Sequence, residues 1–162
     1  MQGLPHSQEA SLLPLFSFGS LMDNELLEMV SGMPASSLAM QLCYALGVVQ
    51  HCVQDESYPV LVDCPGERAE GLLIKGLTPL AMDRILFFEG HQYLFDKLTV
   101  YSDDGTSQSA CYFRDASVYE TTAHPWSFQH WLQHDKQEML ERTQRFMQLF
   151  GTMSALEADP YW

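Results

Sequence analysis

The chain has 162 residues, of which 46% are hydrophobic and 12% aromatic, and its 21 acidic against 8 basic side chains give a formal net charge of −13. This length and composition predict one domain that buries about two-thirds of its unfolded surface. The negative charge repels a phosphate backbone and an anionic membrane surface, so we expect neither nucleic acid nor a membrane as a partner.

The sequence also indicates a compartment. It has no apolar run of the roughly 18 residues that a membrane span needs, and its N-terminus lacks the charged start and apolar stretch of a secretory signal. The four cysteines, Cys43, Cys52, Cys64 and Cys111, are widely spaced. Buried thiols in a reducing compartment are the simpler interpretation, with disulfides or a metal site as alternatives. We therefore expect a cytoplasmic protein.

The N-terminal part of the chain predicts a strand, a turn and a helix. Residues 1–11 are polar and predict a flexible terminus. Residues 12–18 are typical of a strand, and residues 23–30 of a helix with Asp23 as its N-cap. Between them, Gly19, Ser20 and Leu21 form a turn whose backbone N–H groups can cradle a small anion, the alternative being an ordinary turn.

Strand patterns dominate the middle of the chain. Residues 37–53 predict one strand, and residues 58–62 and 69–74 predict two more, separated by a turn at 64–67. A β-hairpin is expected over residues 93–113.

The longest helical pattern covers residues 126–150, and its apolar stripe is typical of a helix docked on a sheet. Strands mostly in succession, with one helix interrupting them and one closing the chain, predict an antiparallel or mixed α+β domain. We place this single domain at residues 12–150, with residues 151–162 as a C-terminal tail.

Glu89 is the candidate for proton transfer. Pro79 and Gly90 mark the ends of a short helix, so Glu89 is its last residue, on the side shared by Ile85 and Leu86. Little water and the negative end of the helix dipole both oppose ionisation there, which predicts a raised pKa for Glu89. A carboxyl group of this kind suits general acid–base chemistry. The alternative is a frayed helix end with Glu89 in solvent.

A metal site is a weaker candidate. His130 and His134 are four residues apart on the last helix, a spacing that can hold a metal ion. No glutamate stands beside the first histidine and no third ligand is identifiable, so a polar helix face is the simpler interpretation. The sequence shows no dinucleotide or P-loop fingerprint and no supported Ser-His-Asp arrangement.

Several short motifs occur in an order that resembles the gamma-glutamylcyclotransferase family, in its avirulence-induced-gene-like branch. These are the aromatic-Gly-Ser-Leu turn at residues 18–21, Tyr58-Pro59, Phe88-Glu89-Gly90 with Tyr93 after it, and the aromatic helix start at residues 126–131. The resemblance covers residues 13–150. It implies a small mixed β-barrel flanked by helices, with a long C-terminal helix.

The resemblance also implies a reaction that needs no cofactor. The α-amine of a gamma-glutamyl group attacks its own side-chain carbonyl, releasing 5-oxoproline and an amine or amino acid. Glu89 serves as base and then acid. Phe18, Gly19, Ser20 and Leu21 bind the substrate carboxylate through their amides, and Tyr58 and Tyr93 complete the substrate site.

Two positions depart from the family pattern. Phe18 stands where the family usually has tyrosine, and Phe95 where many members have arginine. These departures leave a second hypothesis open, a non-catalytic small-anion-binding or protein-interaction module on the same fold. A third hypothesis is a metal-dependent enzyme that uses His130 and His134.

Overall fold

The computed structural model describes residues 13–90, 93–115 and 121–162. The predicted flexible terminus at residues 1–11 lies outside the described residues. The cysteines are all free thiols. No described helix combines the length and the apolar surface that crossing a bilayer requires.

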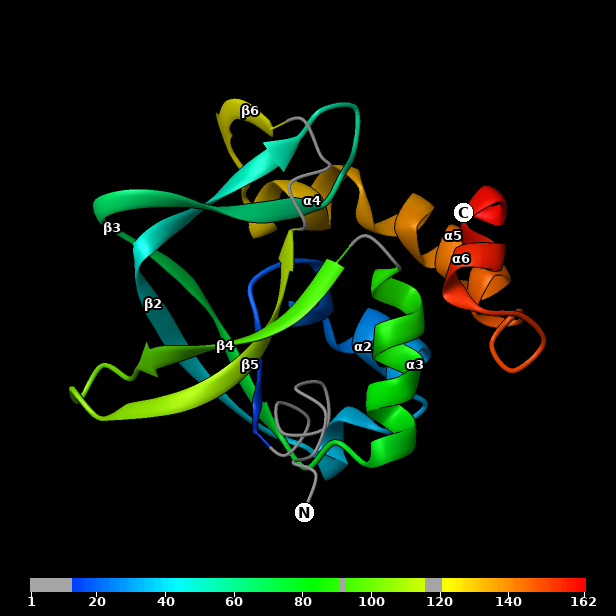
Figure 1. Cartoon of the computed structure of the whole chain (residues 1–162), viewed down its shortest axis with the longest axis horizontal. Coiled ribbons are helices and arrows are strands. Elements are labelled where there is room, and N and C mark those ends of the chain that lie inside the picture. The colour runs from blue at the N-terminus through cyan, green and yellow to red at the C-terminus, as the bar shows by residue number, and fades with distance from the viewer. Residues whose placement is uncertain (1–12, 91–92, 116–120) are drawn as a thin grey trace, which may run out of the picture.

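A closed, mixed β-barrel forms one half of the molecule (Figure 1). Strand β1 pairs antiparallel with β3 and parallel with β5, and pairing of β3 with β2 closes the ring. The strand order is β3-β1-β5-β4-β2, and β6 adds to the free edge of β2. The strands are β1 (Leu15–Ser17), β2 (Ala39–Val53), β3 (Pro59–Lys75), β4 (Tyr93–Tyr101), β5 (Ser107–Asp115) and β6 (Thr121–Pro125). The predicted mixed barrel is therefore confirmed.

The long strand β3 corrects one prediction. The turn predicted at residues 64–67 is wrong, because β3 runs through this stretch without ending. These residues lie opposite Gly47, between the pairs Leu46↔Arg68 and Val48↔Asp63, so they form a bulge rather than a turn. Gly66 has a φ of 87°, which supplies the bend. Pairing with β2 on both sides of the bulge keeps the strand continuous.

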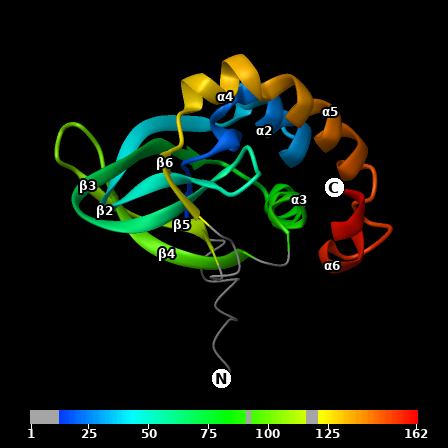
Figure 2. The ribbon, with the colours of Figure 1, turned by 90° about the horizontal axis from the view of Figure 1, so that it is seen from above.

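Helices gather along one side of the barrel, as Figure 2 shows. They are α2 (Asn24–Ser31), α3 (Pro79–Glu89), α4 (Phe128–His134), α5 (Lys136–Met147) and α6 (Ala155–Ala158), with short 3-10 turns η1 (Ser20–Met22), η2 (Ala35–Ser37) and η3 (Asp159–Tyr161). The helix predicted at residues 126–150 is present as α4 and α5, which meet at Asp135.

Two apolar cores hold these layers together. One fills the barrel and includes Phe16, Phe18 and Leu73. The other lies between the barrel and the helices and includes Leu26, Ile85 and Trp131. Strand alternation explains this division, because successive residues of β1 face opposite sides of the sheet.

Polar anchors fix the two helices nearest the predicted site. The carboxylate of Asp23 accepts from the Leu26 N–H at 3.0 Å and pairs with Lys136 Nζ at 3.0 Å, which confirms the predicted N-cap of α2. Arg84 on α3 donates to the carbonyls of Val30 at 2.7 Å and Met29 at 3.1 Å, at the C-terminal end of α2. The position of α3, and of Glu89 at its end, is thereby tied to α2.

Candidate active site

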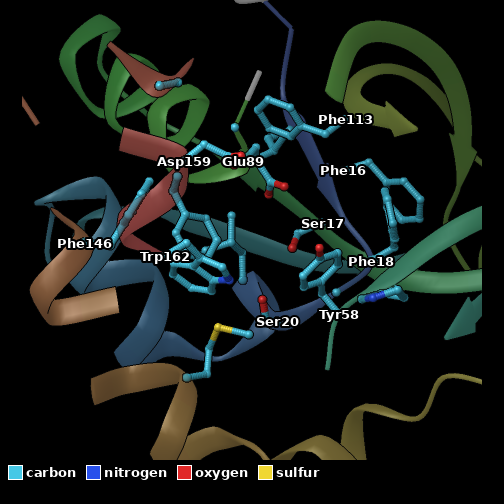
Figure 3. Close-up of a pocket in the computed structure, with 18 residues that line it drawn as sticks. Phe16, Ser17, Phe18, Ser20, Tyr58, Glu89, Phe113, Phe146, Asp159 and Trp162 are labelled. Atoms are coloured by element: carbon cyan, nitrogen blue, oxygen red, sulfur yellow. The ribbon is translucent and has the colours of Figure 1, made fainter. Parts of the chain in front are cut away.

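A cavity of about 110 Å³ lies between the barrel and the helices (Figure 3). Its walls come from β1 and the following turn, the start of β3, the end of α3, and the C-terminal helices. The polar groups that line it include Ser17, Ser20, Tyr58, Glu89 and Asp159. Segments from both ends of the chain therefore meet at one hollow.

Glu89 reaches this cavity from the last residue of α3. Phe87, just before it, stacks on Phe146 of α5 with ring centroids 4.9 Å apart, which holds the helix end in place. In Figure 3 the carboxyl oxygens of Glu89 point into the cavity toward Ser17. The predicted position of Glu89 at the helix end is confirmed.

The environment of the Glu89 carboxyl group opposes its ionisation. The residue is half-buried and lines the cavity. Its carboxyl group makes no hydrogen bond or ion pair with any described residue. Desolvation by burial raises the pKa of Glu89 from 4.5 to about 8. The predicted raised pKa is confirmed, and near neutral pH the group can both accept and donate a proton.

The turn after β1 forms another wall of the same cavity. The backbone N–H groups of this turn donate to no other described residue; they belong to Phe18, Gly19, Ser20 and Leu21. The short helix η1 begins at Ser20. The side chain of Gln50 anchors the turn, because its Nε2 donates to the carbonyl of Phe18 at 3.2 Å. Unpartnered N–H groups at a helix start favour a bound anion.

Close backbone approach shapes this wall. A Cβ atom at Gly19 would lie 3.1 Å from Cδ of Pro59, which is tighter than an ordinary contact. Trp126 Nε1 donates to the carbonyl of Ser57 at 2.9 Å and so holds the neighbouring Tyr58-Pro59 segment against the turn. The structure thus brings Tyr58 to the cavity together with the Gly-Ser turn and Glu89.

The two departures from the family pattern have different surroundings. The Phe18 ring packs in the barrel core, 5.8 Å from the ring of Phe16 and 6.5 Å from that of Tyr112. Phe95 lies on β4 with its ring 5.2 Å from that of Phe113, which lines the cavity. An aromatic pair, of which Phe113 lines the cavity, therefore occupies the place where the resemblance implies a cation.

The remaining predicted residues lie elsewhere or cannot be placed. Tyr93 begins β4, and its side chain lies outside the described part of the structure. His130 and His134 have ring centroids 4.3 Å apart on α4 and are absent from the described cavity lining. Within the described ranges, no group of three or more His, Cys, Asp or Glu side chains is placed to hold a metal ion.

Several cavity residues were not predicted as site residues from the sequence, among them Ser17, Asp159 and Trp162. Ser17 follows from strand alternation only once β1 is known to end at the cavity. Asp159 and Trp162 come from the stretch predicted as a tail, and no spacing rule connects them with Glu89. The aromatic residues at the end of this stretch were the one available signal.

The arrangement of barrel and helices is shared with several solved structures. A protein from Arabidopsis thaliana, solved in solution, aligns with a TM-score of 0.60 at 15% identity, covering 86% of this chain and 93% of that chain. An uncharacterized protein from Homo sapiens aligns with a TM-score of 0.57 at 15% identity, covering 80% and 86%. A gamma-glutamyl cyclotransferase aligns with a TM-score of 0.55 at 14% identity, covering 81% and 85%. The fold is that of the gamma-glutamylcyclotransferases.

The sequence identifies the family directly. The family profile described as gamma-glutamyl cyclotransferase, AIG2-like, matches residues 15–134, and the chain belongs to this family. No curated protein matches the sequence significantly. Family and fold together indicate gamma-glutamyl cyclotransferase-like activity.

Proposed function

We propose that the protein cyclises a gamma-glutamyl compound, releasing 5-oxoproline together with an amine or amino acid, with Glu89 as the proton-transfer group. The observation that carries this proposal is the shared cavity of Glu89 and the unpartnered N–H groups of residues 18–21. An acid that accepts and donates protons and a site for an anion are what the reaction requires. Family membership supports the same assignment.

The α-carboxylate of the substrate binds at the turn. The N–H groups of Gly19, Ser20 and Leu21 donate to it, which satisfies donors that have no partner among the described residues. The hydroxyl groups of Ser17 and Ser20 line the same wall. This placement directs the remainder of the gamma-glutamyl group toward Glu89.

The chemistry begins with the ionised form of Glu89. Its carboxylate takes one proton from the substrate α-ammonium, and the freed amine forms a bond to the side-chain carbonyl carbon. The bond from that carbon to the leaving nitrogen then breaks as Glu89 returns the proton to this nitrogen. The attacking nitrogen loses its second proton on becoming the lactam N–H, and Glu89 passes that proton to the released amine, which leaves as an ammonium. Atoms and charges balance with no other reactant, because nucleophile and carbonyl belong to one molecule. The pKa of about 8 leaves both forms of Glu89 accessible.

The test is direct measurement of 5-oxoproline release from a panel of gamma-glutamyl amines and dipeptides. We expect Glu89→Gln to lower kcat/KM by about 10² to 10⁴. Glu67→Gln, which changes an exposed residue of β3 outside the described cavity lining, is the matched control and should leave turnover unchanged.

Two outcomes would contradict the proposal in different ways. Turnover that is the same in the wild type and in Glu89→Gln would reject the role of Glu89. Absence of turnover with every substrate would favour the anion-binding module instead.

A further inference from the structure

The C-terminal segment, residues 154–162, is docked against the helices that carry the cavity. Ser154 and Glu157 form a reciprocal cap at the start of α6, with bonds of 3.2 and 3.1 Å. The Trp162 ring meets the rings of Phe88 and Phe146 edge-on, with centroids 5.8 and 5.3 Å apart. Aromatic contacts of this geometry stabilise a packed arrangement. The segment lies beyond the residues that match the family profile.

This segment lines the cavity through Ala155, Asp159 and Trp162. In Figure 3, Asp159 and Trp162 lie on one side of the Glu89 carboxyl group, while Ser17 and Tyr58 lie on the other. Under the proposed function, the α-carboxylate occupies the turn and the reacting carbonyl lies beside Glu89. The leaving group therefore extends toward the C-terminal segment.

The side of the cavity that is lined by the C-terminal segment carries a negative charge. Among the described residues that line the cavity, the charged side chains are Glu89 and Asp159, and no lysine, arginine or histidine joins them. The Asp159 carboxylate forms no hydrogen bond or ion pair with a described residue. Arg142 lies over the Trp162 ring, 4.5 Å from its centroid, and lines a neighbouring hollow instead.

We propose that Asp159 determines leaving-group preference, favouring gamma-glutamyl compounds whose leaving group carries an ammonium over those whose leaving group carries a carboxylate. An ammonium at the far end of the leaving group pairs with Asp159. A carboxylate there meets a like charge with no described cation in the cavity wall to offset it. Trp162 supplies the apolar surface along which the methylene part of the leaving group lies. This inference rests on the proposed function.

The experiment uses three gamma-glutamyl substrates of matched length, with diaminopentane, pentylamine and aminopentanoate each joined through a terminal amine. We expect kcat/KM of the wild type to fall in that order, with each step about threefold to fivefold, the range of an exposed ion pair. Asp159→Asn should reduce the ratio between the cationic and anionic substrates about tenfold. Asp159→Lys should reverse the order.

The matched control is Glu141→Gln, which removes the same charge from an exposed residue of α5 outside the described cavity lining. It should leave all three ratios unchanged. Because Asp159 is exposed, both of its variants are expected to fold, and thermal unfolding checks this.

The outcomes separate this inference from the function on which it rests. Release of 5-oxoproline that depends on Glu89, with ratios that do not change in either Asp159 variant, would overturn the role of Asp159 and leave the proposed function standing. No release from any of the three substrates would overturn the proposed function itself. Ratios that change equally in Glu141→Gln would assign the preference to net charge and not to Asp159.

Discussion

The desolvated carboxyl group of Glu89 predicts a specific dependence of stability on pH. Its pKa rises from 4.5 to about 8 on folding, so between these values the folded protein binds one proton more than the unfolded chain. The free energy of unfolding therefore decreases by about 1.4 kcal/mol per pH unit through this window. Stability from the protonated carboxyl is fully present below about pH 4.5 and is lost as the pH rises to about 8. The full difference is about 5 kcal/mol.

Glu89→Gln removes this dependence while preserving the size of the side chain. Glutamine stays uncharged, so the variant should become progressively more stable than the wild type as the pH rises from about 5 to about 8, and the difference should then level off. Chemical denaturation of both proteins across this range measures it, because all other titrating groups are shared and cancel.

The control for this experiment is Glu67→Gln, whose exposed carboxyl group should give a curve parallel to that of the wild type. Curves for Glu89→Gln and the wild type that stay parallel would refute the reasoning. A wild type that gains stability relative to the variant as the pH rises would refute it as well, because the sign would be opposite.

Three further predictions concern activity and packing. We expect kcat/KM to fall about tenfold per pH unit below about pH 8, because only ionised Glu89 accepts the substrate proton; a flat profile there would contradict this. Gly19→Ala should lower kcat/KM about tenfold or more in 5-oxoproline assays, because the added Cβ would lie 3.1 Å from Cδ of Pro59 and force this side chain to shift. Unchanged kinetics would show that Pro59 moves aside without affecting the site. Asp23→Ala should cost about 2 kcal/mol or more in chemical denaturation, because the cap of α2 and the ion pair with Lys136 are both lost. Asp23→Asn, which keeps a capping oxygen, should cost less, and equal losses would contradict the assignment of the cap.

Local signals were sufficient for the parts of the site that lie at helix ends. Asp23 is a preferred N-cap and caps α2 as its sequence position predicts, while Gly32 takes up the left-handed conformation that ends the helix. Pro79 and Gly90 bracket α3, so Glu89 could be placed at its end from spacing alone. These predictions succeed because caps depend on residues within one turn of the helix.

Features that depend on distant pairing were not accessible from the sequence. Gly66 has the turn chemistry expected of a loop, but pairing of β3 with β2 on both sides makes the stretch a bulge. Strand β6 has exposed positions and no alternating apolar pattern, and its edge pairing with β2 defines it. Asp159 and Trp162 reach the cavity only because Trp162 packs on Phe88 and Phe146, a contact between segments far apart in the chain.

The cavity is defined by the desolvated carboxyl group of Glu89 and by the N–H groups of the turn after β1. Each is unfavourable in the unliganded protein, and a different set of contacts holds each in place. Packing of Phe87 on Phe146 keeps the end of α3, and with it the desolvated carboxyl of Glu89, at the cavity. Gln50 holds the turn at Phe18, while the neighbouring N–H groups have no partner within the described ranges. Under the proposed function, a gamma-glutamyl group would relieve both, since its carboxylate would accept from these N–H groups and its ammonium would favour an ionised Glu89. Binding would thereby offset the free-energy cost of the desolvated carboxyl and of the unpartnered donors, so the proposed function predicts a preference for ligands that carry both a carboxylate and an ammonium.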